Sequence, residues 1–147
     1  MGFASRAQNN LQTVILVDDM KSAFTLPSML FKSWGYNVVS LQAGKDFYSP
    51  EELKEKIKSN NPFLVITDHQ MGTMSGLDTL KAAHAVNPDL PVVVHSTELE
   101  KIPGYPDITG EGPGKFKGAY SKDDRQRFKT IATSLGMNTE RTAMEID

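Results

Sequence analysis

The chain has 147 residues, a formal net charge of −2 at pH 7 and no cysteine. Its length is typical of one domain, and the absence of cysteine excludes disulfides, thiolate nucleophiles and cysteine-ligated zinc. The near-neutral charge favours neither a nucleic-acid surface nor an anionic-membrane surface, and no apolar stretch is long enough to span a bilayer. The first residues also lack the apolar segment of a signal peptide. We therefore expect a cytoplasmic protein that contacts neither nucleic acid nor membrane.

Apolar, β-rich runs alternate with segments of helical periodicity along most of the chain. Runs that are apolar on both faces are typical of buried parallel strands, and the alternation predicts a doubly wound α/β fold with helices on both faces of one sheet. Pro27 interrupts one helical segment, so we expect a kink or a late helix start there. The predicted strands lie at residues 13–17, 36–41, 63–67, 91–95 and 117–121, and the predicted helices lie at 21–34, 75–86 and 125–135, with a further helix that begins at Pro50 after the capping residue Ser49.

One segment departs from this alternation. The sequence "ELEKIPGYPDITGEGPGKFKG" (residues 98–118) lies where the pattern requires a helix, but its glycines and prolines are too dense for a normal one. We therefore predict that the fourth helix is replaced or shortened. The domain is expected to span residues 12–136, between a flexible N-terminus (1–11) and a C-terminal tail (137–147).

Charged and hydroxyl side chains stand where the predicted strands end. Asp18 and Asp19 end the first strand and Asp68 ends the third, while Ser96 follows the fourth and Lys122 the fifth. The carboxyl ends of parallel strands form one crevice, and three carboxylates that share it repel one another unless a cation is present. Hard oxygen ligands favour Mg²⁺. Simpler interpretations remain open, with Asp19 as a helix cap, Ser96 as a turn hydroxyl and Lys122 as a surface lysine.

The order and spacing of four motifs carry a resemblance to a known family. "ILVDDM" supplies the paired acids, "VITDHQMGTMSGLDTL" the acid-ended strand with its loop, "PVVVHST" the hydroxyl strand and "GAYSK" the lysine. Over about residues 12–135, the chain resembles the receiver domain of two-component response regulators, in particular the single-domain, chemotaxis-regulator-like kind. The resemblance implies a flavodoxin-like fold, in which a five-stranded parallel sheet has the order 2-1-3-4-5.

The resemblance implies a role for each matched acid. Asp68 lies at the position of the phosphorylated aspartate. Asp18 and Asp19 lie at the positions that hold Mg²⁺, together with Asp68 and the backbone carbonyl of Gln70. The implied cofactor is therefore Mg²⁺.

The phosphoryl-binding residues match the family less closely. Ser96 lies at the position of the switch hydroxyl, and Lys122 at that of the lysine that pairs with the phosphoryl oxygens. Thr97 stands where the family has a smaller residue, so we expect narrower access to the phosphoryl group. The switch aromatic of the family usually lies three residues before the lysine, whereas Tyr120 lies two before it. Either the strand is shifted or bulged, or Tyr120 does not serve as the switch.

The function implied by the resemblance is that of a phosphoacceptor in two-component signal transduction. A sensor histidine kinase or a phosphotransfer protein would phosphorylate Asp68 with Mg²⁺, and the output would be a contact with an unidentified downstream protein. Homodimerisation stays open. Self-catalysed phosphotransfer and dephosphorylation by such a domain are slow, so we do not expect an enzyme in the ordinary sense.

Two rival functions remain. The chain resembles a receiver whose fourth-helix region is atypical, so a degenerate receiver that binds partners without phosphorylation is the first alternative. An aspartyl phosphohydrolase is the second, but it requires an acid two residues after Asp18, where Met20 stands. The chain can also be a fragment of a longer regulator. His69 and His95 flank the predicted site and are not assigned to it.

Overall fold

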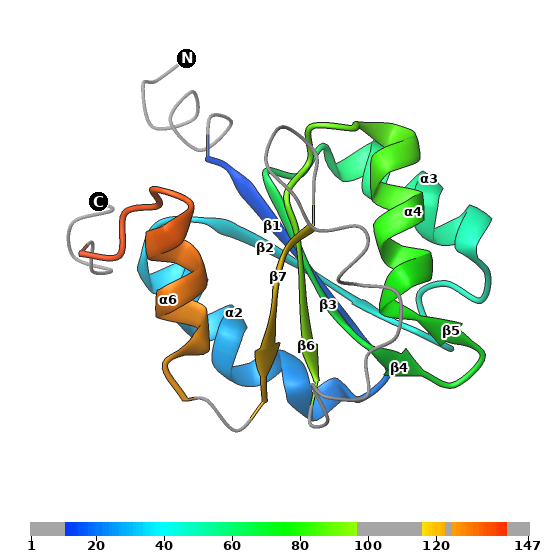
Figure 1. Cartoon of the computed structure of the whole chain (residues 1–147), viewed down its shortest axis with the longest axis horizontal. Coiled ribbons are helices and arrows are strands. Elements are labelled where there is room, and N and C mark those ends of the chain that lie inside the picture. The colour runs from blue at the N-terminus through cyan, green and yellow to red at the C-terminus, as the bar shows by residue number, and fades with distance from the viewer. Residues whose placement is uncertain (1–10, 97–115, 123–124, 141–147) are drawn as a thin grey trace, which may run out of the picture.

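The computed structural model describes residues 11–96, 116–122 and 125–140, and for residues 116–120 it describes the backbone. Its centre is a sheet of five parallel strands in the order β2-β1-β3-β6-β7 (Figure 1). Counted along the chain, this is the predicted order 2-1-3-4-5, so the predicted fold class is confirmed. The strands are β1 (Thr13–Asp18), β2 (Asn37–Gln42), β3 (Leu64–Asp68), β6 (Val92–Ser96) and β7 (Phe116–Ser121).

Helices cover both faces of the sheet, as a doubly wound fold requires. Figure 1 shows α3 and α4 on one side of the strands and α2 and α6 on the other. The described helices are the 3₁₀-helix η1 (Lys21–Phe24), α2 (Thr25–Ser33), α3 (Pro50–Asn60), α4 (Gly76–Val86) and α6 (Arg127–Ser134). No helix in the described ranges is both long and apolar enough to cross a membrane.

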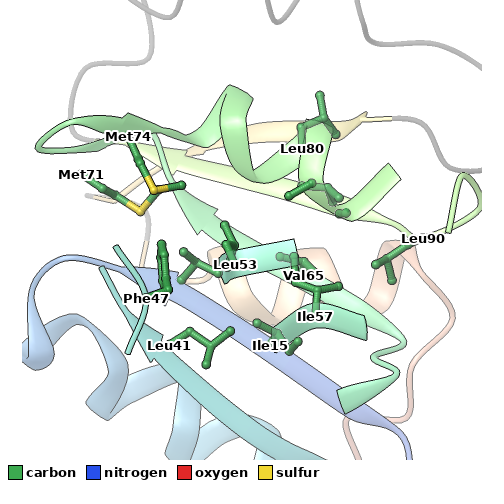
Figure 2. Close-up of a cluster of buried hydrophobic side chains, with 14 of the residues drawn as sticks. Ile15, Leu41, Phe47, Leu53, Ile57, Val65, Met71, Met74, Leu80 and Leu90 are labelled. Atoms are coloured by element: carbon green, nitrogen blue, oxygen red, sulfur yellow. The ribbon is translucent and has the colours of Figure 1, made fainter. Parts of the chain in front are cut away.

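Side-chain alternation along the strands divides the hydrophobic core into two layers, because successive residues point to opposite faces. The layer between the sheet and α3/α4 includes Ile15, Leu41, Leu53, Ile57, Val65 and Leu80 (Figure 2). The layer on the opposite face includes Val14, Leu16, Phe31, Ile66, Phe128 and Ile131. Both layers stop at the carboxyl ends of the strands, where the side chains become polar.

Of the two outcomes expected at Pro27, a kink or a late helix start, the structure shows the late start. The chain first forms the 3₁₀ turn of η1, and α2 begins at Thr25, which places Pro27 in its first turn. A proline is tolerated there because the first N–H groups of a helix have no intrahelical partner. Gly35, at φ 96°, then turns the chain into β2.

A two-stranded hairpin, β4 (Gln70–Met71) and β5 (Met74–Ser75), follows Asp68. Gly72 has a φ of +73° at the turn, where a residue without a Cβ avoids steric strain. Met71 and Met74 are buried beside Phe47 (Figure 2), so they anchor the hairpin to the core. The sequence predicted a loop here but not the hairpin.

A capping box fixes the start of α4. The Ser75 hydroxyl accepts from the Asp78 N–H at 3.3 Å, and the Asp78 carboxylate accepts from the Ser75 N–H at 2.9 Å. The neighbouring Gly76 N–H donates to the carbonyl of His69 at 2.7 Å. These bonds tie the start of α4 to the backbone next to Asp68.

Ser75→Ala is expected to lower the free energy of unfolding by about 1 kcal/mol, because the Asp78 N–H loses its side-chain acceptor. Chemical denaturation measures this loss. Ser59→Ala, which removes an exposed hydroxyl inside α3, should leave stability unchanged or slightly higher, since alanine favours helix. Equal stabilities for Ser75→Ala and the wild type would contradict the capping role.

The C-terminal end of the described chain stays in contact with the domain. Met137 is buried in the α2/α6 layer, and the Asn138 N–H donates to the Tyr36 hydroxyl at 2.9 Å. The predicted domain limits stay predictions. The predicted loss or shortening of the fourth helix falls on residues 97–115, which lie outside the described residues, as do residues 1–10 and 141–147 of the predicted flexible ends.

Candidate functional site at the carboxyl end of the sheet

Strand register brings the predicted site residues to one end of the sheet. Val17 of β1 pairs with Thr67 of β3, so Asp18 and Asp68 follow at neighbouring positions. Asp68 pairs in turn with His95 of β6. All three side chains lie on the α2/α6 face, since each is two residues beyond a side chain of that layer.

Lys122 bridges two of the acids. Its Nζ lies 3.1 Å from Asp18 Oδ2 and 3.1 Å from Asp68 Oδ1. The Lys122 N–H donates to the Ser96 carbonyl at 2.9 Å, which fixes the chain just beyond β7. The simpler interpretation of Lys122 as an unattached surface residue is therefore wrong, because this ammonium group lies between two buried carboxylates.

The two bridged acids have opposite electrostatic environments. Burial alone raises the pKa of Asp18, but hydrogen bonds from His95 and the Met20 N–H and the charge of Lys122 outweigh it and hold that pKa below its ordinary range. Burial and the negative charge of Asp18 raise the pKa of Asp68 above its ordinary value of 3.8, despite the nearby lysine. Burial lowers the pKa of Lys122, but Asp18 and Asp68 together raise it above the ordinary value. Asp18 is therefore the acid whose ionised form the site favours, and Asp68 is the acid whose ionised form the site disfavours.

The remaining predicted metal ligands lie beside this pair. Asp19 is partly exposed, and burial together with the negative charge of Asp18 raises its pKa. Gln70 opens β4 and pairs with Ser75 across the hairpin. The Ser75 N–H donates to the Asp78 carboxylate rather than to the backbone carbonyl of Gln70. One oxygen or nitrogen ligand atom from each of Asp18, Asp68 and His95 lies within 4.8 Å of the others. Carboxylate and carbonyl oxygens are ligands that fit Mg²⁺, so the donor set present suits a hard divalent cation.

A cavity of about 300 Å³ opens beside Asp19. Its apolar walls are formed by Phe47, Met71 and Met74, which also anchor the β4–β5 hairpin. Asp19 is the acidic residue of its lining. The cavity therefore reaches Asp19 from the hairpin side.

Comparison with known proteins identifies the family. The family model of the response regulator receiver domain matches residues 14–103, which is more than half of the chain. The chain belongs to this family.

The sequence relatives of this receiver domain are longer proteins. The transcriptional regulatory protein ZraR of Salmonella typhimurium is 35% identical over 81 residues, which cover 55% of this chain and 17% of that protein. ZraR of Escherichia coli strain K12 matches with the same identity and the same coverage. This chain thus spans a small part of the length of the curated relatives it matches.

Solved receiver structures share its fold. A receiver domain protein of Clostridium thermocellum has a TM-score of 0.64 at 19% identity, covering 86% of this chain and 94% of that one. The chemotaxis response regulator CheY4 of Vibrio cholerae has a TM-score of 0.63 at 20% identity, with coverages of 86% and 98%. At such identities the likeness supports the receiver fold alone.

The receiver domain contains two site neighbours that sequence reasoning did not assign. His95 is buried, and its Nε2 lies 3.6 Å from Asp18 Oδ2. Arg127, the first residue of α6, donates from Nε to His95 Nδ1 at 3.4 Å and from Nη1 to the Lys122 carbonyl at 2.9 Å. His95 could have been suspected from its position beside Ser96, but only the register with Asp68 shows that it faces the acids. No motif or neighbouring residue in the sequence points to Arg127 in the same way.

The other predicted phosphoryl-binding residues are only partly described. Ser96 is buried at the end of β6 and pairs with Ser121 of β7. Thr97 lies outside the described residues. The β6–β7 pairing has the irregularity that sequence allowed for, since Val92 pairs with Phe116 but Val94 pairs with Ala119.

This irregularity does not lie between Tyr120 and Lys122, so it does not change the face of the strand on which Tyr120 lies relative to the lysine. It lies before Ala119, and pairing is regular from there to Ser121, with the Tyr120 backbone opposite His95. The bulge therefore does not compensate for the two-residue spacing between Tyr120 and Lys122. The role of Tyr120 as a switch stays a prediction.

Asp68→Asn is expected to stabilise the metal-free receiver domain at pH 7, by on the order of 1 kcal/mol, because it removes the carboxylate whose ionised form the site disfavours. Since folding raises the pKa of Asp68, the folded protein binds more protons than the unfolded chain above the ordinary pKa of 3.8. The wild type therefore loses more stability than the variant as the pH rises through this window. The gain should grow as the pH rises above 3.8 and vanish at lower pH.

Urea denaturation across this pH range measures the difference between the two proteins. Asp89→Asn is the matched control, because Asp89 is an exposed carboxylate in the turn before β6 and should change stability by less than about 0.5 kcal/mol. An Asp68→Asn protein that is no more stable than the wild type at pH 7 would contradict the electrostatic environment described for Asp68.

Proposed function

We propose that this receiver domain is a phosphoacceptor whose nucleophile is Asp68, and that phosphorylation requires Mg²⁺. The observation that carries the proposal is the position of Lys122, 3.1 Å from both Asp68 and Asp18 at the carboxyl end of the sheet. A lysine held in this way supplies positive charge next to Asp68, which of the two bridged carboxylates is the one whose pKa is raised. Positive charge at that point stabilises phosphoryl oxygens during transfer.

The chemistry is a displacement at phosphorus. A carboxylate oxygen of Asp68 forms the new P–O bond while the bond from phosphorus to the donor's leaving atom breaks. With a phosphohistidine donor, the leaving ring nitrogen takes the bonding electron pair and later a proton, and the product is an acyl phosphate on Asp68. Lys122, whose Nζ already lies 3.1 Å from Asp68 Oδ1, can then turn from Asp18 towards the phosphoryl oxygens.

The acids at this end of the sheet would hold the cation. Asp18, Asp19 and Asp68 supply carboxylate oxygens, and the backbone carbonyl of Gln70 is the further ligand we propose. When bound, Mg²⁺ neutralises charge on the transferring phosphoryl oxygens. The low pKa of Asp18 keeps this carboxylate ionised for that role.

The proposal includes the switch and its partners. Ser96 would hydrogen-bond the phosphoryl group and so favour a second conformation of the surrounding surface. The donor would be a sensor histidine kinase or a phosphotransfer protein in the cytoplasm, and the output a contact with a downstream protein. Self-catalysed transfer and hydrolysis would be slow, so the domain would act as a switch rather than as an ordinary enzyme.

Intact mass spectrometry after incubation with acetyl phosphate tests this proposal. We expect a gain of one phosphoryl group that requires Mg²⁺ and that is absent in Asp68→Asn. Asp89→Asn, with the same change in charge far from the site, should be phosphorylated like the wild type. A folded protein that gains no phosphoryl group from the donor would overturn the proposal and favour a degenerate receiver that binds partners without phosphorylation.

A further inference from the structure

Contacts on two edges and one face hold Arg127 in place among the described residues. Its Nη1 donates to the backbone carbonyl of Lys122 at 2.9 Å, and its Nε donates to His95 Nδ1 at 3.4 Å. Its guanidinium carbon also lies 4.2 Å from the ring centroid of Phe128, the distance of a cation–π contact. A planar guanidinium that is stacked and hydrogen-bonded on two edges has little freedom left, so Arg127 is a rigid element at the start of α6.

His95 connects this arginine with the acids. Because Nδ1 accepts a hydrogen bond from Arg127, the proton of the neutral ring lies on Nε2, which faces Asp18 Oδ2 at 3.6 Å. The His95 ring also packs edge-on against Phe128, with 6.0 Å between the centroids. Burial and the positive charges of Lys122 and Arg127 lower the pKa of His95, in agreement with a neutral ring.

We propose that Arg127 and His95 act as a pair of positioning residues, which hold Lys122 and Asp18 in register with Asp68 and link the position of Lys122 to the first turn of α6. Arg127 holds Lys122 through the Lys122 backbone carbonyl, while the His95 ring lies against Asp18, with Nε2 3.6 Å from Oδ2. The described contacts thus place Arg127 one contact away from Lys122, which touches Asp68, and His95 beside Asp18. The backbone of His95 also pairs with Asp68 in the sheet.

This pair also gives the proposed phosphorylation a route to α6, and this part of the inference rests on the proposed function. If Lys122 moves from Asp18 to a phosphoryl oxygen on Asp68, the backbone at Lys122 shifts. The bond from Arg127 Nη1 to the Lys122 carbonyl then pulls on the first residue of α6. Phosphorylation would therefore displace the start of this helix.

Hydrogen exchange in the unphosphorylated protein tests the positioning role without any phosphodonor. The Lys122 amide, which donates to the Ser96 carbonyl at 2.9 Å, should exchange about tenfold faster in Arg127→Gln than in the wild type. Arg125→Gln is the matched control, because Arg125 is exposed two residues away and carries the same charge. Exchange at Lys122 that is equal in both variants would overturn the positioning role.

Phosphorylation rates then separate positioning from general stability. We expect the rate with acetyl phosphate to fall about fivefold in Arg127→Gln and in His95→Phe, which keeps a ring against Phe128 but lacks both nitrogens. The double variant should fall no further than about the larger single effect, because the two residues act as one unit. Independent, multiplying losses, or losses that match those of Arg125→Gln, would overturn the pairing.

The link to α6 is read from the backbone amide resonances of Arg127–Ser134. Phosphorylation should shift these resonances in the wild type and in Arg125→Gln, and should shift them much less in Arg127→Gln. Equal shifts in all three proteins would overturn the link. A wild type that gains no phosphoryl group would overturn the proposed function, and the exchange experiment would still decide the positioning role.

Discussion

Lys122→Met is expected to lower the free energy of unfolding of the metal-free protein by about 3 kcal/mol at pH 7. Methionine keeps an unbranched, apolar side chain but removes the ammonium group, which leaves Asp18 and Asp68 facing each other without their shared cation. The two carboxylate side chains are only 2% and 11% exposed, so water screens them poorly. Protonation of Asp68 relieves the repulsion, and the loss should therefore shrink as the pH falls.

Urea denaturation with and without Mg²⁺ measures this effect. A divalent cation should stabilise Lys122→Met more than the wild type, because the variant's acids have no lysine to compete with the ion. Lys129→Met, which removes an exposed ammonium group from α6, is the matched control and should change stability by less than about 0.5 kcal/mol. A loss of that small size in Lys122→Met would contradict the bridging role.

Phe31→Ala is expected to cost about 4 kcal/mol, because it empties the centre of the aromatic layer that joins α2 to α6. Phe31 is fully buried, and its ring lies edge-on to Trp34, Tyr36 and Phe128 at centroid distances of 5.3, 6.4 and 6.3 Å. Each such contact adds to the stability gained from burial. Since Phe128 packs against both His95 and Arg127, the loss should also loosen the site.

Thermal or chemical unfolding checks this loss, with Met29→Ala as the matched control. Met29 lies on the same helix but is 63% exposed, so its truncation should change stability by less than about 0.5 kcal/mol. Phe31→Leu keeps most of the volume and should lose clearly less than Phe31→Ala. Similar stabilities for Phe31→Ala and Met29→Ala would mean that the aromatic layer does not hold α2 and α6 together.

The fold was predictable because its signals are local. Apolar runs that end at Asp18 and Asp68 identify buried strands, and Ser49 followed by Pro50 identifies the start of α3, where the structure shows the Ser49 hydroxyl accepting from the Glu52 N–H. Pro27 predicted the late start of α2 because the geometry of proline excludes the helix interior. The strand order required more than local signals, and it followed from the family resemblance.

The parts that sequence missed depend on contacts between distant residues. The β4–β5 hairpin forms because Met71 and Met74 pack beside Phe47, which lies more than 20 residues earlier in the chain. His95 faces Asp18 only because β3 pairs with β6 in one particular register. Arg127 donates to His95 from a position 32 residues later in the chain. None of these contacts leaves a periodicity or a short motif in the sequence.

The site itself was predicted residue by residue from the family, and the structure explains why these residues lie together. Asp18 and Asp68 end adjacent strands, and Lys122 reaches both from beyond β7. Asp19 directly follows β1 and Gln70 opens β4, and their roles as ligands stay proposals. The separation of the two aspartate pKa values, lowered at Asp18 and raised at Asp68, could not be predicted because it depends on burial and on His95.

The measurement that tests the central proposal most directly is to locate the phosphorylated residue. The protein is incubated with acetyl phosphate and Mg²⁺, treated with borohydride, which reduces an aspartyl phosphate to homoserine, and digested for peptide sequencing by tandem mass spectrometry. We predict homoserine at position 68 and unmodified aspartate at positions 18 and 19. Homoserine at position 18 or 19, or at no position in a folded protein, would contradict the assignment of Asp68 as the phosphoacceptor.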